Sequence, residues 1–185
     1  EILSKAIEKT LETIEEKNPN LENKLEVAQQ MGVGAVIFSD LSSNRIKDVS
    51  FSWEEILNFD GETGPYVQYT HARACSVLRK AEGLGAGVQA DFDSNLLSSK
   101  EEYQLVKTLA AFPDKVTQAL ENLEPSILTR YLVDVAQDFN RFYHEHSILV
   151  EDQALRNARL VLVKVMKSTL ASGLRLIGLH APTRV

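Results

Sequence analysis

The chain has 185 residues, with 26 Asp and Glu against 20 Lys and Arg, and its formal net charge is −6. Hydrophobic residues make up 44% and charged residues 25%, which is ordinary for a globular protein and excludes disorder throughout the chain. The single cysteine, Cys75, excludes an internal disulfide and a paired Cys/His zinc site, so we expect a reducing, cytoplasmic location. No apolar run approaches the roughly 18 residues that cross a bilayer, so we expect no membrane partner.

The N-terminal part combines two predicted helices with a less regular segment. Residues 1–17 carry apolar side chains at helical spacing, and residues 21–31 repeat this pattern until Gly32. Beyond Gly32, residues 35–38 fit either a strand or a buried helix, and residues 49–53 alternate like a short strand. The pattern predicts a small mixed α/β segment.

A turn at residues 60–65 precedes the next predicted helix, which runs from Pro65, a residue well suited to a first helical turn, to about Ala81. The segment 83–87 is rich in glycine, as dinucleotide-binding loops are. The spacing of the glycines does not fit the fingerprint of those loops, and they follow a helix where the fingerprint follows a strand. We interpret them as a helix end and a flexible connection.

The rest of the chain is predicted to be helical apart from a polar loop. Helices are expected at about 100–111, 113–122, 126–146 and 152–171, and Gly173 is expected to end the last one. In the third of these, one face carries a long apolar stripe, made of Leu128, Tyr131, Leu132, Val135, Phe139 and Phe142. The prediction is a mainly α-helical bundle preceded by the small mixed segment.

No constellation of side chains predicts catalysis or metal binding. His144 and His146 are two apart, so on a helix they point about 200° away from each other, whereas a zinc-protease helix needs them four apart. No Ser, Cys or Thr stands in a recognisable nucleophile motif. We therefore expect no catalytic residue and no metal ligand in this chain.

One helix face has the chemistry of a nucleic-acid contact. Tyr69 and Arg73 are four residues apart, which stacks a phenol and a guanidinium on the same face. Both planes can stack on an unstacked RNA base, and Arg can also donate to a base edge or a phosphate. Residues 64–90 hold three basic and one acidic residue, and 151–185 hold six and two, so a polyanion would meet the acidic chain at these segments. Ordinary solvated helix faces are the alternative.

Three separated motifs resemble the C-terminal half of arginyl-tRNA synthetases. The first two are Val33-Gly34-Ala35-Val36-Ile37-Phe38-Ser39-Asp40 with its continuation to Arg45, and Gly61-Glu62-Thr63-Gly64-Pro65-Tyr66-Val67-Gln68-Tyr69-Thr70-His71-Ala72-Arg73. The third is the ending, with Gln153-Ala154-Leu155-Arg156-Asn157-Ala158-Arg159-Leu160, Gly173-Leu174-Arg175-Leu176-Ile177-Gly178 and Ala181-Pro182-Thr183-Arg184. The matches occur in order, so the resemblance covers nearly the whole chain.

The resemblance implies a helical anticodon-binding bundle of the class I type named after the Asp-Ala-Leu-Arg motif. Residues 61–185 would form this domain, and residues 1–60 an adaptor that follows a catalytic domain. The two ATP-binding signatures of class I enzymes are absent, and the chain begins with Glu1 and not with Met, so we expect an excised piece that is inactive alone. ATP with magnesium would serve the parent enzyme, an arginine–tRNA ligase, and no cofactor is expected in this piece.

The resemblance also implies where the tRNA would bind. It places recognition on Tyr69, Arg73, Tyr143 and the final residue, Val185, where the family usually has Met. Arg159 is expected to contact phosphate and Arg156 to make a structural pair. The motif's Asp is replaced by Gln153, and Asp152 is expected to serve the helix start electrostatically.

The expected partner is a tRNA for arginine, bound by a monomer, with no DNA partner. Two alternatives remain. One is the anticodon-binding bundle of another class I-like synthetase, against which the Gly64–Arg73 stretch argues. The other is a helical protein-interaction module, which the acidic total charge would suit.

Overall fold

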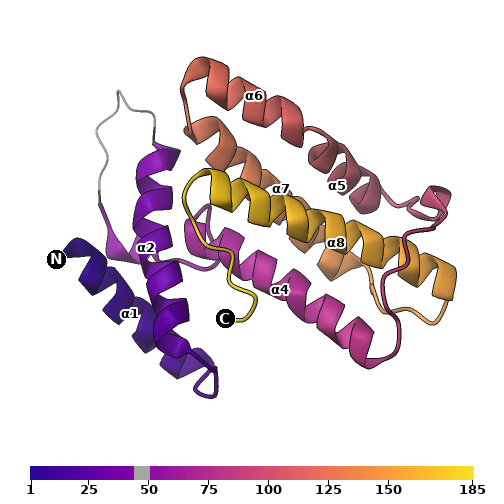
Figure 1. Ribbon diagram of the computed structural model, residues 1–185, viewed down its shortest axis with the longest axis horizontal. Coiled ribbons are helices and arrows are strands. Elements are labelled where there is room, and N and C mark those ends of the chain that lie inside the picture. The colour runs from indigo at the N-terminus through magenta and orange to yellow at the C-terminus, as the bar shows by residue number, and fades with distance from the viewer. Residues whose placement is uncertain (44–50) are drawn as a thin grey trace.

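The structure, a computed structural model, describes residues 1–43 and 51–185, and most of these residues lie in helices (Figure 1). The elements in chain order are α1 (Ile2–Lys17), α2 (Lys24–Ser42), α3 (Trp53–Ile56), α4 (Gly64–Gly83), the 3-10 turn η1 (Ser94–Leu96), α5 (Lys100–Ala110), α6 (Phe112–Asn122), α7 (Ser126–Glu145) and α8 (Gln153–Leu176). The connection from α4 to α5 is long and contains one 3-10 turn. The prediction of a mainly helical chain is confirmed.

Helix α7 is the centre of the bundle. It contacts α4 and α8 on one side and α5 and α6 on the other, and Figure 1 shows α5 and α6 along one flank of the bundle and α4 along the opposite flank. The predicted apolar stripe of α7 is buried along its whole length. Leu132, Val135, Phe139 and Phe142 are fully enclosed and pack with Leu105 and other apolar residues in one large core.

Helices α1 and α2 form an antiparallel pair beside this bundle, with a small core of their own. Ile14, Leu21 and Met31 are buried in it, and Val185 from the far end of the chain packs against it. α2 also contacts α4 and α7, which fixes the pair against the bundle. The C-terminal segment runs between the pair and α4 in Figure 1.

Local signals explain where several helices begin. The Thr63 side chain accepts a hydrogen bond from the Tyr66 amide at the start of α4, and Pro65 lies in its first turn. Ser99 and Glu102 form a capping box at α5. Asp152 caps α8 by accepting from the Leu155 amide at 3.0 Å, so the expected interaction of this residue with the helix start is present.

Two glycines expected to end helices lie inside them. A Cβ on Gly32 would lie 2.8 Å from the carbonyl carbon of Ala6, so Gly32 allows α1 and α2 to approach closely and α2 continues to Ser42. A Cβ on Gly173 would overlap the Cδ2 atom of Leu132, and α8 continues to Leu176. Both predictions were wrong because packing outweighs the helix propensity of glycine.

The small mixed α/β segment is not found among the described residues. Residues 35–38 lie in α2, which settles the ambiguity between strand and helix in favour of the helix. Of the run 49–53, Val49 and Ser50 lie outside the described residues, and Trp53 begins α3. Within 1–43 and 51–185 no strand occurs.

The connection at residues 83–87 behaves as a helix end. Gly83 is the last residue of α4, and Gly85 has φ +70°, a left-handed conformation that glycine adopts without steric cost. None of the helices in the described ranges is both long enough and apolar enough to cross a bilayer.

Candidate functional site

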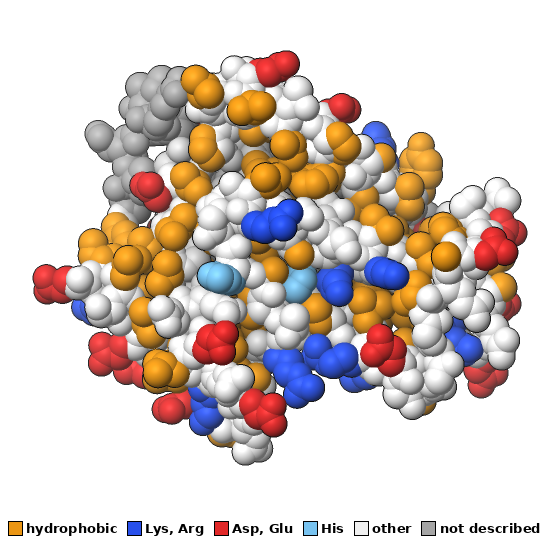
Figure 2. Space-filling view, in the orientation of Figure 1, with side chains coloured by type: hydrophobic (Ala, Val, Ile, Leu, Met, Phe, Trp, Pro, Cys, Tyr) orange, Lys and Arg blue, Asp and Glu red, His pale blue; other side chains and the backbone are white. Residues whose placement is uncertain are grey.

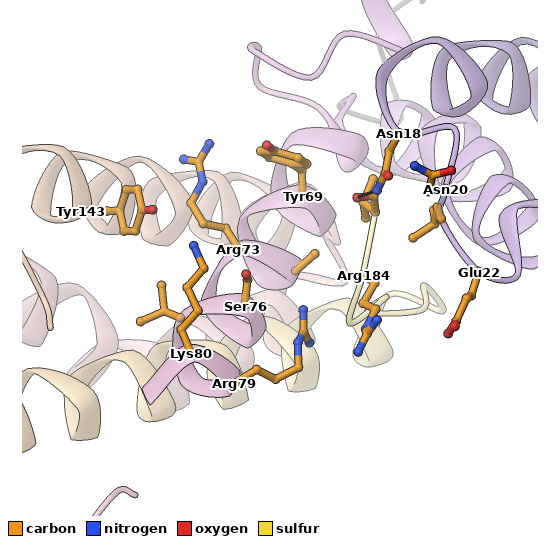
Figure 3. A pocket seen from close by; sticks show the side chains of 14 residues that line it. Asn18, Asn20, Glu22, Tyr69, Arg73, Ser76, Arg79, Lys80, Tyr143 and Arg184 are labelled. Atoms are coloured by element: carbon orange, nitrogen blue, oxygen red, sulfur yellow. Dashed lines mark hydrogen bonds between the residues drawn. The ribbon is translucent and has the colours of Figure 1, made fainter. Parts of the chain in front are cut away.

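A pocket of about 600 Å³ lies where α4, the α1–α2 connection and the C-terminal segment meet (Figure 3). Its lining residues are Asn18, Asn20, Leu21, Glu22, Tyr69, Ala72, Arg73, Ser76, Val77, Arg79, Lys80, Tyr143, Arg184 and Val185. Four residues that the sequence predicts as tRNA contacts are among them, namely Tyr69, Arg73, Tyr143 and Val185. The fold therefore brings together residues from three distant parts of the chain.

Arg73 lies between two aromatic rings. Its Cζ atom is 5.0 Å from the ring centroid of Tyr69, one turn earlier on α4, and 5.3 Å from that of Tyr143 on α7. Figure 3 shows the Arg73 side chain between the two phenols. Tyr69 is 38% exposed, so part of this ring is open to a ligand. The three side chains form two cation–π contacts, and their aromatic and guanidinium groups are of the kinds that stack on nucleic-acid bases.

The charge of the pocket is strongly positive for an acidic protein. Arg73, Arg79, Lys80 and Arg184 line it, and among the described residues Glu22 is the one acidic side chain in the lining. Figure 2 shows Lys and Arg side chains gathered over α4 and the C-terminal segment. A polyanion that approaches this face meets a favourable field, whereas the acidic total charge disfavours indiscriminate binding elsewhere.

The C-terminal segment is held in place by side chains that donate to its backbone carbonyls. The donors on α4 are Gln68 to His180 at 2.9 Å, His71 to Pro182 at 2.9 Å and Arg79 to Thr183 at 3.0 Å. Asn18, at the end of α1, donates to the Val185 carbonyl at 3.1 Å. These bonds fix Arg184 and Val185 at the rim of the pocket.

His71 is buried, and its ring is held as the neutral form. Burial lowers the pKa of His71 and outweighs the hydrogen bond to the Pro182 carbonyl, which raises it, while the positive charge of Lys167 lowers it further. The bond to Pro182 requires a proton on Nδ1. His71 is therefore a structural donor that joins α4 to the C-terminal segment.

Arg159 does not lie at the pocket. It is only 9% exposed, its Nε atom donates to Oε1 of Glu102 at 2.7 Å, and its Nη1 atom donates to the carbonyl of Ser147 at 2.6 Å. The first of these bonds joins α8 to α5 through the guanidinium. The phosphate contact expected of Arg159 stays a prediction, and Arg159 is not among the residues that line the pocket.

Glu102 is the charged partner of Arg159 in the contact between α8 and α5. Burial by itself raises the pKa of Glu102, but the hydrogen bonds from the Ser99 amide and from Arg159 outweigh it and hold the pKa below its usual range. The carboxylate therefore stays charged beside the guanidinium.

Arg156, expected to make a structural pair, donates to the carbonyls of Val150 and Glu151 at the start of α8.

His146, which follows the last residue of α7, contacts α5. His146 Nε2 lies 3.0 Å from Oε2 of Glu101, and this contact lowers the pKa of the Glu101 carboxyl. Within the ranges that the structure describes, no group of three or more His, Cys, Asp or Glu could hold a metal ion.

Several residues of the site were not identified from sequence. They are Asn18, Gln68, His71, Arg79, Lys80, Asn140 and Arg184. Gln68 and His71 lie inside the stretch that carries the family resemblance, which was a usable signal. Asn18 and Asn140 carry no signal in the sequence, because their roles depend on partners that are far away along the chain.

The structure is a helical bundle with a basic pocket that tyrosines line on α4 and α7, and the comparison with family models gives its class. The model described as "DALR anticodon binding domain" matches residues 67–185, so the chain belongs to the DALR anticodon-binding domain family. The model described as "tRNA synthetases class I (R), catalytic domain" matches residues 1–53.

The chain is also similar to curated proteins. The chain is 52% identical over 185 residues to an "Arginine--tRNA ligase" of Alkaliphilus metalliredigens. The match spans 100% of this chain and 32% of that protein. The chain is 51% identical over 183 residues to the "Arginine--tRNA ligase" of Clostridioides difficile, and this match spans 99% of the chain and 32% of the relative. The chain thus spans about a third of the length of these relatives.

The chain is also similar to solved structures of arginyl-tRNA synthetases. The arginyl-tRNA synthetase of Thermus thermophilus has a TM-score of 0.92 and 36% identity over 100% of this chain and 32% of that one. The arginyl-tRNA synthetase of Plasmodium falciparum has a TM-score of 0.78 and 25% identity over 99% of this chain and 32% of that one. The family resemblance predicted from the three motifs is confirmed.

Proposed function

We propose that this chain is the anticodon-binding part of an arginine–tRNA ligase and that the pocket on α4 binds unstacked bases of the anticodon loop. The observation that carries the proposal is the Arg73 guanidinium held between the rings of Tyr69 and Tyr143 at the wall of a basic pocket. Base–aromatic stacking contributes about 1–3 kcal/mol per base, which is enough to hold an opened loop. The similarity to arginine–tRNA ligases over the whole chain supports arginine tRNA as the partner.

The lining residues divide into two chemical groups. Tyr69, Arg73 and Tyr143 supply planes for stacking and donors for a base edge. Arg79, Lys80 and Arg184 supply positive charge for the backbone phosphates on either side. Val185 is half-buried against the α1–α2 pair and covers less of a base than the longer Met of the family would.

We propose that residues 1–60 act as an adaptor between the catalytic part of the parent enzyme and the bundle at 61–185. The match of residues 1–53 to the catalytic-domain model and the packing of α2 on α4 and α7 support this division. The parent reaction would be the ATP-dependent joining of arginine to its tRNA in the cytoplasm, with ATP and magnesium bound by the rest of the parent. This chain would act as a monomer that orients the tRNA and would not aminoacylate alone.

The test is equilibrium binding, at one stated salt concentration, to an arginine tRNA and to the same tRNA with its middle anticodon base changed from cytosine to uracil. All arginine codons have guanine in the middle, so the cognate anticodon has cytosine there. A loss of about tenfold, or roughly 1.4 kcal/mol, would support base recognition by this chain. Equal affinity for both would contradict it. Binding to neither, with a folded chain, would favour a protein-interaction module.

A further inference from the structure

Asn140 is a nearly buried polar residue on the face of α7 that packs against α4. It is 9% exposed, and it does not line the pocket. A buried amide is stabilised only when its donors and acceptor find partners. All of its side-chain hydrogen bonds go to residues of α4, and one of them reaches a residue of the proposed base-binding stack.

The hydrogen bonds of Asn140 allow one orientation of its amide. Its Nδ2 atom donates to the hydroxyl of Tyr66 at 2.9 Å and to Oγ1 of Thr70 at 3.0 Å. Its Oδ1 atom accepts from Nη1 of Arg73. A guanidinium has donors and no acceptor, so a reversed amide would place two donors face to face. The Thr70 hydroxyl gives its own hydrogen to the Tyr66 carbonyl, so its oxygen accepts from Nδ2 and requires the same orientation of the amide. The amide oxygen in turn holds one nitrogen of Arg73.

This arrangement determines where the guanidinium of Arg73 can point. Arginine has many rotamers, and holding it in one of them on binding costs conformational entropy. Here the rings of Tyr69 and Tyr143 lie on either side of the guanidinium, with centroids 5.0 and 5.3 Å from the Cζ atom, and limit its movement between them. The bond to Asn140 holds one of its nitrogens and limits its rotation. The donors of Arg73 not used by Asn140 are thus aimed before a ligand arrives, which favours binding by preorganisation.

We propose that Asn140 is the positioning residue of this pocket, which sets the orientation of Arg73 and thereby the choice of base. The inference rests on the proposed function. Loss of Asn140 leaves the positive charge of Arg73 in place, so attraction to phosphate persists. The guanidinium is then free to turn, and discrimination between bases falls more than overall affinity does.

The test compares Asn140→Leu with Asn140→Asp in the whole chain. Leu has a similar size and makes no hydrogen bond, whereas Asp keeps an acceptor for Arg73 and can accept from the neighbouring hydroxyls. The measured quantity is the ratio of affinities for arginine tRNA carrying cytosine or uracil at the middle anticodon position. We expect Asn140→Leu to lower this ratio about three- to tenfold, the effect of one lost hydrogen bond, and Asn140→Asp to retain it. An unchanged ratio in folded Asn140→Leu overturns the proposal.

Two further measurements separate positioning from a general structural effect. In an Arg73→Ala background, Asn140→Leu should change the ratio no further, and a loss as large as in the parent chain would overturn the proposal. If Asn140→Leu does not fold, the double variant with Tyr66→Phe and Thr70→Val removes the two acceptors that orient the amide. It should lower the ratio about twofold or more, and an unchanged ratio would overturn the proposal.

The same data separate the inference from the proposed function. If the parent chain does not discriminate between the two tRNAs, the proposed function fails before any variant is compared. If the parent chain discriminates and Arg73→Ala abolishes discrimination while Asn140→Leu retains it, only the role of Asn140 fails.

Discussion

The Nε atom of Arg159 lies 2.7 Å from Oε1 of Glu102, and this ion pair joins α8 to α5 with both side chains nearly removed from solvent. Glu102 also caps α5 through Ser99, so one carboxylate serves two elements. Removing one partner of such a pair leaves a buried charge uncompensated. The pair therefore belongs to the stability of the bundle.

Arg159→Met should destabilise the chain by about 3 kcal/mol, because Glu102 would remain buried without its partner. The free energy of unfolding from urea titration measures this effect. Arg141→Ala is the matched control, since the Arg141–Asp138 pair is at 3.4 Å and the arginine side chain is 59% exposed. Its cost should be within about 0.5 kcal/mol. Equal effects in the two variants would contradict the assignment.

Substitutions in the aromatic stack should weaken binding of arginine tRNA. Tyr69→Ala, Arg73→Ala and Tyr143→Ala should each cost about 1–3 kcal/mol, because each removes a stacking plane. Fluorescence anisotropy at fixed salt measures the loss. Tyr103→Ala is the control, since Tyr103 is 68% exposed on α5 and does not line the pocket. Normal affinity in all three folded variants would remove the stack from the site.

The basic side chains of the pocket should make the affinity for tRNA depend on salt concentration. Lys80→Ala and Arg184→Ala should each reduce the slope of log K against log salt by about 0.7, the value for one contact to a single-stranded phosphate. Lys107→Ala, an exposed residue of α5 outside the pocket, should leave the slope unchanged. A similar reduction in all three would indicate a diffuse field and not a defined phosphate contact.

Stability should fall between neutral and mildly acidic pH because of His71. Its pKa is lowered from 6.5 in the folded chain, chiefly by burial, so the unfolded chain takes up the proton more readily. The contribution of His71 is complete above about pH 6.5 and is lost as the pH falls through the folded-state pKa. Urea titrations at pH 7.5 and 5.5 measure this loss.

His71→Gln keeps a donor for the Pro182 carbonyl and cannot take up a proton. This variant should show a smaller decrease in stability between the two pH values than the parent chain does. An identical decrease in both would assign the pH dependence to other groups.

Gly32→Ala should destabilise the α1–α2 pair by about 1–3 kcal/mol, because the new methyl would meet the backbone of Ala6, which cannot move aside as a side chain can. Thermal unfolding measures the effect. Gly83→Ala is the control at the end of α4, where an added Cβ meets nothing within 4 Å. It should be neutral or stabilising by up to about 1 kcal/mol. A larger loss in the control would contradict the steric argument.

The sequence predicted the parts of the fold that depend on local pattern. The stripe on α7 and the turn before α4 were identified because apolar spacing and caps act over a few residues. The breaks expected at Gly32 and Gly173 were wrong, because in each case the deciding neighbour, Ala6 or Leu132, is far away in sequence.

The candidate site shows the same limit. Tyr69 and Arg73 could be paired from their spacing on one helix, and the family resemblance added Tyr143 and Val185. The pairing of Arg159 with Glu102 could not be predicted, because Glu102 lies 57 residues earlier. Spacing along one helix does not reveal which of two arginines is buried.

The contact between Asn18 and Val185 joins residues 167 positions apart, and both residues line the pocket. The contacts within α4, α7 and α8 span shorter stretches, and contacts close in sequence form faster than distant ones. We expect the bundle helices to condense first and this side of the pocket to close last. The apolar core would then be in place before the pocket is complete.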